Sequence, residues 1–203
     1  MKEKKIILAS VSPRRKGLLQ QIGINFEVIP SNFKEDMTLK MPPHKLVVHL
    51  ALGKAKDVAN RIKEGIVIGA DTFFVLNKEF IGKPKNEKDA IKTLKKISGK
   101  TLKVYSGIAI IDSKTGKTIT DYEVTDIKIR KMSDHEIKSY VKTKEPLDKA
   151  ASIAIQGLGA IFIEKLNGCY TNVIGLPLHC LANNLKKFGV NIFKYERWKN
   201  YVE

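Results

Sequence analysis

A turn near the N-terminus combines hydroxyl and guanidinium groups in a pattern typical of anion sites. An apolar run predicts a buried strand, and Ser10 and Ser12 follow it in a Ser-x-Ser-Pro turn. Pro13 suits the first position of a helix, whose free N–H groups and positive dipole end would lie beside Arg14 and Arg15. Because guanidinium groups match phosphate oxygens, we predict a phosphate site. The alternative is that Ser12 only caps the helix and that both arginines are solvated.

A carboxylate follows another apolar run in the middle of the chain. The residues Ile66-Val67-Ile68-Gly69-Ala70-Asp71 predict a buried strand that ends in an acid. In α/β proteins, ligands collect at the carboxyl ends of strands, so Asp71 is expected at the same edge as the N-terminal turn. A carboxylate in that place must be paired, solvated or bound to metal. We therefore favour a catalytic or metal-binding role for Asp71 over a structural one.

Further charged residues could complete such a site. Lys54 lies off the middle of the apolar stripe of a predicted helix, where it is either a surface residue or a ligand for a phosphate. Lys83 is presented by the stiff segment Gly82-Lys83-Pro84. Glu35 and Asp36 form an acidic pair in a polar loop. This pair is either solvated, or one member faces the anion site and helps to hold a divalent cation.

Alternating strand and helix patterns must position these residues. Strands are expected directly before Ser10, over 26–29 and 66–72, and over 101–111 and 117–129. Hairpins are expected to turn at Asn77-Lys78 and, within 160–174, at Asn167-Gly168. Helices are expected from Pro13, over 43–64 and 87–97, after the capping box at Ser133, and from Pro177 to Gly189. The order indicates an α/β protein.

Length and composition set the broad class. With 203 residues, of which 43% are hydrophobic, the chain can bury a substantial core as one domain or as two tightly joined lobes. It contains no apolar run of membrane-spanning length and no secretory signal, so we expect a cytoplasmic protein without a membrane partner. Cys169 and Cys180 are expected to be reduced and buried, and the spacing of the four histidines predicts no zinc site.

The formal net charge of +16 favours polyanionic partners such as nucleic acid, anionic membranes or phosphorylated metabolites. The excess is nearly all lysine and is spread along the chain, without a basic block interleaved with aromatic residues. Much of this charge is therefore interpreted as solvated surface, and nucleic acid is not the expected partner.

Five separate motifs together resemble the Maf family of nucleoside triphosphate pyrophosphatases. In chain order they are Leu8-Ala9-Ser10 with Ser12-Pro13-Arg14-Arg15, Gly69-Ala70-Asp71-Thr72, Gly82-Lys83-Pro84, Glu145-Pro146-Leu147-Asp148-Lys149-Ala150 with Ile155-Gln156-Gly157, and Asn172-Val173-Ile174-Gly175-Leu176-Pro177-Leu178. The resemblance covers about residues 5–190 of a single Maf-like domain, 1–203, with a C-terminal tail over 194–203 that contains Trp198.

The resemblance implies a fold of the Maf/Ham1 type, in which an elongated, twisted mixed sheet is flanked by helices and two lobes enclose a nucleotide cleft. It implies hydrolysis of the bond between the α and β phosphates of a nucleoside triphosphate, to monophosphate and pyrophosphate, with a divalent metal, Mg²⁺ or Mn²⁺. Members that prefer dTTP and UTP are the most similar, which implies removal of unwanted pyrimidine nucleotides from the nucleotide pool. Whether the chain forms a homodimer is left open.

Residue roles follow from the same resemblance. Asp71 matches the general base, and it is expected to bind the metal together with Glu35. The other residues that line the phosphate and metal site match Ser10, Arg15, Lys54 and Lys83. The three positions that read the base in the family are occupied in this chain by Arg14, Thr72 and Gln156. The side chains of Thr72 and Gln156 offer both donors and acceptors, as recognition of a uracil or thymine edge requires.

The chain departs from the family at several positions. Leu102 stands where a histidine is usual, Ala151 and Ala154 stand where glycine is common, and Ile153 replaces a common tyrosine. Alanine disfavours a positive φ, so the loop that presents Gln156 is expected to be affected. A second hypothesis, a nucleic-acid-binding or regulatory protein that kept the fold without catalysis, rests on the missing histidine and the charge.

Overall fold

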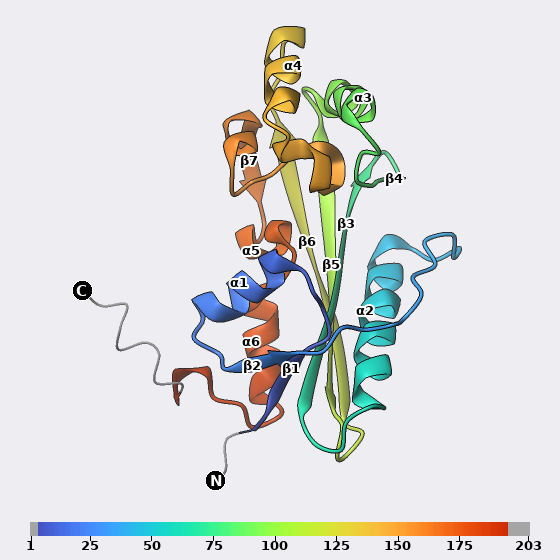
Figure 1. The fold of residues 1–203 in the computed structure, drawn as a ribbon, viewed down its shortest axis with the longest axis vertical. Helices are drawn as coiled ribbons and strands as arrows, with labels where there is room; N and C mark the ends of the chain where they lie inside the picture. The colour runs from blue at the N-terminus through green and yellow to red at the C-terminus, as the bar shows by residue number, and fades with distance from the viewer. Residues whose placement is uncertain (1–3, 195–203) are drawn as a thin grey trace, which may run out of the picture. The chain divides into compact units, whose positions relative to one another are not determined.

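The computed structural model describes residues 4–194, so the predicted tail over 194–203, with Trp198, lies outside the described residues apart from Lys194. Within the described part, seven strands form one mixed sheet in the order β2-β1-β3-β5-β6-β7, with β4 paired to β3. The predicted α/β class with a mixed sheet and flanking helices is confirmed (Figure 1). In chain order the strands are β1 (Ile6–Leu8), β2 (Phe26–Val28), β3 (Ile66–Leu76), β4 (Glu79–Ile81), β5 (Thr101–Asp112), β6 (Thr118–Ile129) and β7 (Ile163–Asn167).

Six α-helices within residues 4–194 accompany the strands. They are α1 (Pro13–Gln21), α2 (Pro43–Ala59), α3 (Glu87–Ile97), α4 (Asp134–Lys142), α5 (Tyr170–Ile174) and α6 (Leu178–Lys186). Short 3-10 turns lie at Glu145–Asp148, Ala150–Ser152, Leu158–Phe162 and Ile192–Lys194. None of the described helices is long and apolar enough to cross a membrane.

The chain forms two compact units, and β3, β5 and β6 each contribute residues to both. Within the described residues, unit 1 consists of 4–71, 106–123 and 175–194, and unit 2 consists of 72–105 and 124–174. Each unit contains its own cluster of buried apolar side chains.

In unit 1, β1 pairs in parallel with both β2 and β3, and α2 covers this part of the sheet (Figure 1). Two glycines allow the close approach of α2. A Cβ at Gly69 of β3 would lie 2.3 Å from the Ala51 carbonyl oxygen, and one at Gly107 of β5 would lie 2.4 Å from the Val47 carbonyl oxygen. The helix backbone therefore rests directly on the sheet, and α2 side chains reach positions beside β3.

Most predicted elements of unit 1 are confirmed, with two differences. The helix predicted over 43–64 ends at Ala59, because the N–H groups of Arg61 and Ile62 turn back to nearby carbonyl groups before Gly65. The strand predicted over 66–72 continues to Leu76, so Asp71 lies inside β3 rather than at its end. Continued pairing explains this extension, since β3 forms a hairpin with β4 beyond Asp71.

In unit 2, the β3–β4 hairpin turns at Asn77-Lys78 as predicted, and both residues have positive φ. Asn86 caps α3, and Ser133 and Glu136 form the predicted capping box of α4. The predicted hairpin at Asn167-Gly168 is wrong: β7 pairs with β6, and α5 follows Gly168.

Hydrogen bonds of Thr125 explain the missing hairpin. Its Oγ1 accepts from the Cys169 N–H at 3.0 Å and donates to the Cys169 carbonyl at 3.2 Å, and it also accepts from Asn172 Nδ2 at 2.9 Å. These contacts draw the chain after Gly168 back to β6. Cys169 and Cys180 are both free thiols, of which Cys180 is buried and Cys169 is partly exposed.

Candidate nucleotide and metal site

The N-terminal turn of unit 1 begins where β1 leaves the sheet. Leu8 is the last paired residue of β1, opposite Ile68, and the Ala9 N–H donates to the Ile68 carbonyl at 2.8 Å. The chain then departs at Ser10, whereas β3 continues. Asp71 therefore lies three residues beyond the last β1 pair, where β3 has no β1 partner. Because β1 ends at Leu8, the turn that follows it begins beside the part of β3 just before Asp71.

Ser10 and Arg15 meet within this turn. The Ser10 Oγ accepts from the Ser12 N–H at 3.2 Å and from Arg15 Nη1 at 3.3 Å. Ser12 occupies the N-cap position of α1, but its side chain forms no capping hydrogen bond. Arg15 Nε donates to the Gly175 carbonyl at 2.9 Å. The guanidinium is thereby fixed at the start of α1 by two acceptors, one of which comes from the far end of the sequence.

Two acids of unit 1 act electrostatically on Arg15. Burial lowers the pKa of the Arg15 guanidinium, attraction by Asp71 and Glu35 opposes this shift, and repulsion by Arg14 adds to it. The charged groups that act on Arg15 are therefore among those that the family resemblance assigned to the site. An arginine with reduced access to water binds an anion strongly, because fewer water contacts must be replaced.

Lys54 lies between two carboxylates. Its Nζ is 2.6 Å from Asp71 Oδ1 and 2.7 Å from Glu35 Oε1. The side chains of Lys54 and Asp71 are only 11% and 9% exposed, whereas that of Glu35 is 46% exposed. The two carboxylate oxygens are separated by no more than the sum of those two distances. The Lys54 ammonium group thus holds the two acids together beside a buried strand.

The two acids of the 30–36 loop take different roles. Glu35 contacts Lys54, whereas Asp36 Oδ1 accepts from the Thr38 N–H and hydroxyl at 2.8 and 2.6 Å. These hydrogen bonds lower the pKa of Asp36 and are typical of a capped turn. Of the two acids left open by the sequence, Glu35 is the one at the site.

The three remaining predicted residues belong to unit 2. Thr72 follows Asp71 on β3, Lys83 lies between β4 and α3, and Gln156 is exposed in the segment before Leu158. Their contribution to the unit 1 site stays a prediction from the sequence.

The positions that depart from the family motifs also lie in unit 2. Leu102 and Ala151 are fully buried in its core, and Ala151 has φ of 55°. Alanine therefore adopts the left-handed backbone that glycine accepts more readily, at a cost of roughly 1–2 kcal/mol. The effect of the alanines on the loop that presents Gln156 stays a prediction from the sequence.

Sequence reasoning missed two features of the site. The Gly175 carbonyl that binds Arg15 could not be anticipated, because backbone acceptors carry no residue signature. Asp57 was also missed, although it lies one helical turn after Lys54. Its Oδ2 accepts from the Asn32 N–H at 2.8 Å, and Asn32 precedes Glu35 by three residues. The i, i+3 spacing of Lys54 and Asp57 on one helix was the signal in the sequence that could have identified Asp57.

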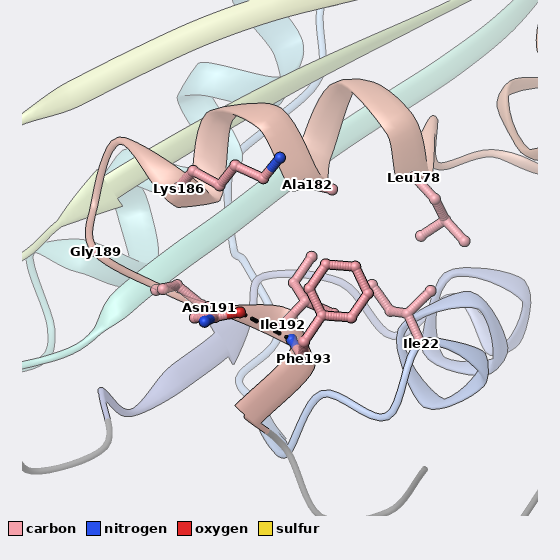
Figure 2. Close-up of a pocket in the computed structure, with 9 residues that line it drawn as sticks. Ile22, Leu178, Ala182, Lys186, Gly189, Asn191, Ile192 and Phe193 are labelled. Carbon is pink, nitrogen blue, oxygen red and sulfur yellow. Dashed lines mark hydrogen bonds between the residues drawn. The ribbon is translucent and has the colours of Figure 1, made fainter.

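A separate pocket in unit 1 does not contain the predicted residues. It has a volume of about 590 Å³, and its lining comes mostly from α6 and the segment that follows it (Figure 2). The lining is apolar apart from Lys186 and Asn191. A triphosphate requires several cationic groups, so we do not assign nucleotide binding to this pocket.

Known proteins resemble the chain over most of its length. The family described as Maf-like protein matches residues 5–188. A dTTP/UTP pyrophosphatase of Caldicellulosiruptor saccharolyticus is 44% identical over 197 residues, which cover 95% of this chain and 99% of that protein. A dTTP/UTP pyrophosphatase of Methanococcoides burtonii is 46% identical over 191 residues, which cover 94% and 98%. Among solved structures, a HAM1 protein from Coxiella burnetii is similar with a TM-score of 0.45 at 13% identity, covering 78% of this chain and 98% of that one.

Proposed function

The chain belongs to the Maf family, and we propose that it hydrolyses dTTP and UTP, or modified pyrimidine nucleotides, to the monophosphate and pyrophosphate. One observation carries this proposal. The Asp71–Lys54–Glu35 cluster lies within electrostatic range of Arg15, in a chain that aligns with dTTP/UTP pyrophosphatases over nearly its full length. The activity removes unwanted nucleotides from the cytoplasmic pool.

The phosphate groups are proposed to bind at the N-terminal turn. Arg15 and Ser10 would donate hydrogen bonds to phosphate oxygens, and Arg14 would add a second positive charge. The five ionised side chains of this site in unit 1, those of Arg14, Arg15, Glu35, Lys54 and Asp71, sum to one positive charge. A triphosphate carries about four negative charges, so further cations are needed to balance it. Lys83 is proposed to supply one of them.

Asp71 is proposed as the general base. Its carboxylate would hold the attacking water and accept a proton from it as the water attacks the phosphorus. Burial suits this role, because few other waters compete for a carboxylate with a 9% exposed side chain. The leaving pyrophosphate would be released as the bond between the α phosphorus and the bridging oxygen breaks.

The donor set fits a divalent cation. Lys54 Nζ shows that one positive charge can lie within hydrogen-bond distance of both Asp71 and Glu35. Within residues 4–194 no group of three or more His, Cys, Asp or Glu side chains could hold a metal ion. Mg²⁺ is commonly bound by one or two carboxylates together with substrate phosphates, so Asp71 and Glu35 would hold Mg²⁺ or Mn²⁺ with the nucleotide. The metal would supply charge neutralisation of the phosphate oxygens.

Thr72 and Gln156 are proposed to read the base. Each side chain offers a donor and an acceptor, which a uracil or thymine edge can satisfy together. A purine would leave these groups unpaired, and that is the physical source of selectivity. The nucleic-acid-binding alternative gains no support from the site or from the relatives.

Release of pyrophosphate tests the proposal. Purified protein with Mg²⁺ or Mn²⁺ and a panel of nucleotides should release pyrophosphate fastest from dTTP, UTP or their modified forms. Asp71→Asn should lower turnover by about two to four orders of magnitude. Asp36→Asn is the matched control, since Asp36 is an acid that only closes a turn with Thr38. Release of orthophosphate alone, or full turnover of Asp71→Asn, would contradict the assignment.

A further inference from the structure

Glu35 depends on a loop that has no regular secondary structure. Residues 30–36, here called the Glu35 loop, connect β2 toward α2 within unit 1. The Glu35 side chain is 46% exposed, yet its Oε1 lies 2.7 Å from Lys54 Nζ. An exposed side chain on an irregular loop keeps such a contact only if the backbone before it is held in place.

Asp57 provides the first anchor of the Glu35 loop. Its Oδ2 accepts from the Asn32 N–H at 2.8 Å and from the Ser31 hydroxyl at 3.1 Å. The Ser31 Oγ in turn accepts from the Phe33 N–H at 3.0 Å. The Asn32 hydrogen bond is the main cause of the lowered pKa of Asp57. Three consecutive loop residues are thus bound directly or indirectly to one carboxylate.

Arg61 extends this anchor by one helical turn. Its Nη2 donates to Asp57 Oδ2 at 2.9 Å and to the Pro30 carbonyl at 2.5 Å. The guanidinium therefore orients the Asp57 carboxylate and also holds the first residue of the Glu35 loop. Asp57 lies in the C-terminal part of α2, and Arg61 lies just beyond its end. The i, i+3 spacing of Lys54 and Asp57 places these two side chains on the same side of the helix.

Phe33 provides the second anchor. A Cβ at Gly53 would lie 2.3–2.6 Å from three ring atoms of Phe33, so the ring rests on the bare backbone of α2 directly before Lys54. The ring also meets His49 edge to face, with centroids 6.2 Å apart. Glu35 follows Phe33 by only two residues. The position of this ring therefore limits where the Glu35 carboxylate can lie.

We propose that Asp57 is a positioning residue for cation binding: together with Arg61 and the Phe33–Gly53 contact, it holds the Glu35 loop on α2 so that Glu35 and Asp71 share one cation. The inference rests on the proposed function, because that function requires a divalent ion between these two acids. Helix α2 then supplies both Lys54, which contacts the two carboxylates, and Asp57, which would hold the Glu35 carboxylate in place for the ion.

The test measures Mn²⁺ alone, by loss of the free-ion EPR signal during titration. Asp57→Ala should raise the Kd for Mn²⁺ about tenfold, the typical effect of removing a group that orients a metal ligand. Asp57→Asn should have a smaller effect, since its amide oxygen still accepts from Asn32. Gly53→Ala should also raise the Kd, because the added methyl displaces the Phe33 ring.

Matched controls separate positioning from general damage. Lys56→Ala changes an exposed side chain on the same helix, and Gly17→Ala adds a methyl to α1 where nothing lies within 4 Å. Both should leave the Kd unchanged. In a Glu35→Gln background, Asp57→Ala should have little further effect on the Kd, whereas a purely structural role would lower affinity in both backgrounds. Thermal unfolding verifies that each variant is folded, and if Asp57→Ala is not, Asp57→Asn and Gly53→Ala carry the test.

The outcomes distinguish this inference from the proposed function. An unchanged Mn²⁺ Kd in folded Asp57→Ala and Gly53→Ala, or a wild-type protein that binds no Mn²⁺, overturns the positioning role. The two variants can have a raised Mn²⁺ Kd while the wild-type protein releases no pyrophosphate from any nucleotide. That combination supports the positioning role and overturns the proposed function. Equal losses with and without Glu35 overturn the positioning role and assign Asp57 to stability.

Discussion

Replacing Lys54 with methionine tests the electrostatic balance of the site. Methionine matches the length of the lysine stem and its helix propensity, so the main change is the loss of the ammonium group. Asp71 and Glu35 would then face each other without the cation that lies 2.6 and 2.7 Å from them. The side chain of Asp71 is 9% exposed and cannot gain full hydration in compensation. Lys54→Met should therefore destabilise the protein and abolish efficient turnover.

The size of the effect follows from burial. Removing one partner of a buried ion pair typically costs about 3–5 kcal/mol. Because the Glu35 side chain is 46% exposed and partly screened by water, the lower end applies, about 3 kcal/mol. For a chain of 203 residues, each kcal/mol shifts Tm by about 2–4 °C, so Tm should fall by about 6–12 °C in EDTA.

Addition of a divalent cation should reverse the loss. Mg²⁺ or Mn²⁺ can occupy the space between the two carboxylates, and at a concentration of 100 Kd it would restore about 2.7 kcal/mol. Thermal unfolding of wild type and Lys54→Met, each with EDTA and with the metal, measures both effects. Lys56→Met on the exposed side of α2 is the control. A Lys54→Met variant with wild-type Tm in EDTA, or one that the metal does not stabilise, would refute the reasoning.

Three further predictions concern the scaffold. Lys78 is an exposed turn residue whose φ of 70° is strained for most residues except glycine, so Lys78→Gly should stabilise the protein by about 1 kcal/mol in urea unfolding. A lower urea midpoint for this variant would show that the backbone of Lys78 is not strained. Gly69→Ala should cost about 3 kcal/mol or more by the same measurement, because its Cβ would lie 2.3 Å from the Ala51 carbonyl oxygen; a near-neutral effect would show that α2 is not tightly seated. Hydrogen bonds from Arg130 and Ser133 lower the pKa of Glu136 from 4.5 to about 2. This contribution to stability is present above pH 4.5 and lost as pH falls toward about 2, so Glu136→Gln should flatten the pH dependence of Tm in that window, and an unchanged profile would exclude Glu136 as its source.

Local patterns were sufficient for most elements. The helix starts at Pro13, Asn86 and Ser133 and the turn at Asn77-Lys78 depend on caps, fixed φ angles and turn geometry within a few residues. Such signals do not depend on distant contacts, and the structure agrees with them.

The predictions that failed involve partners far away in the sequence. Asn167-Gly168 has the composition of a hairpin turn, yet Thr125 binds the backbone of Cys169 and the chain enters α5. Short-range propensity is weak relative to hydrogen bonds that a distant segment supplies.

Residue types and their spacing indicated anion chemistry at Ser10 and Arg15 and catalytic or metal chemistry at Asp71. For Lys54 and the Glu35–Asp36 pair they left a surface role open, and the family resemblance selected Lys54 and Glu35. Only the tertiary structure decided that Lys54 bridges the two acids, that Asp36 instead binds Thr38, and that Asp57 holds the loop between β2 and α2. The reason is physical: a side chain's chemistry is a local property of the sequence, whereas its partner depends on which backbones can approach closely. Here that approach depends on the bare backbone of Gly69 and Gly107 beneath α2.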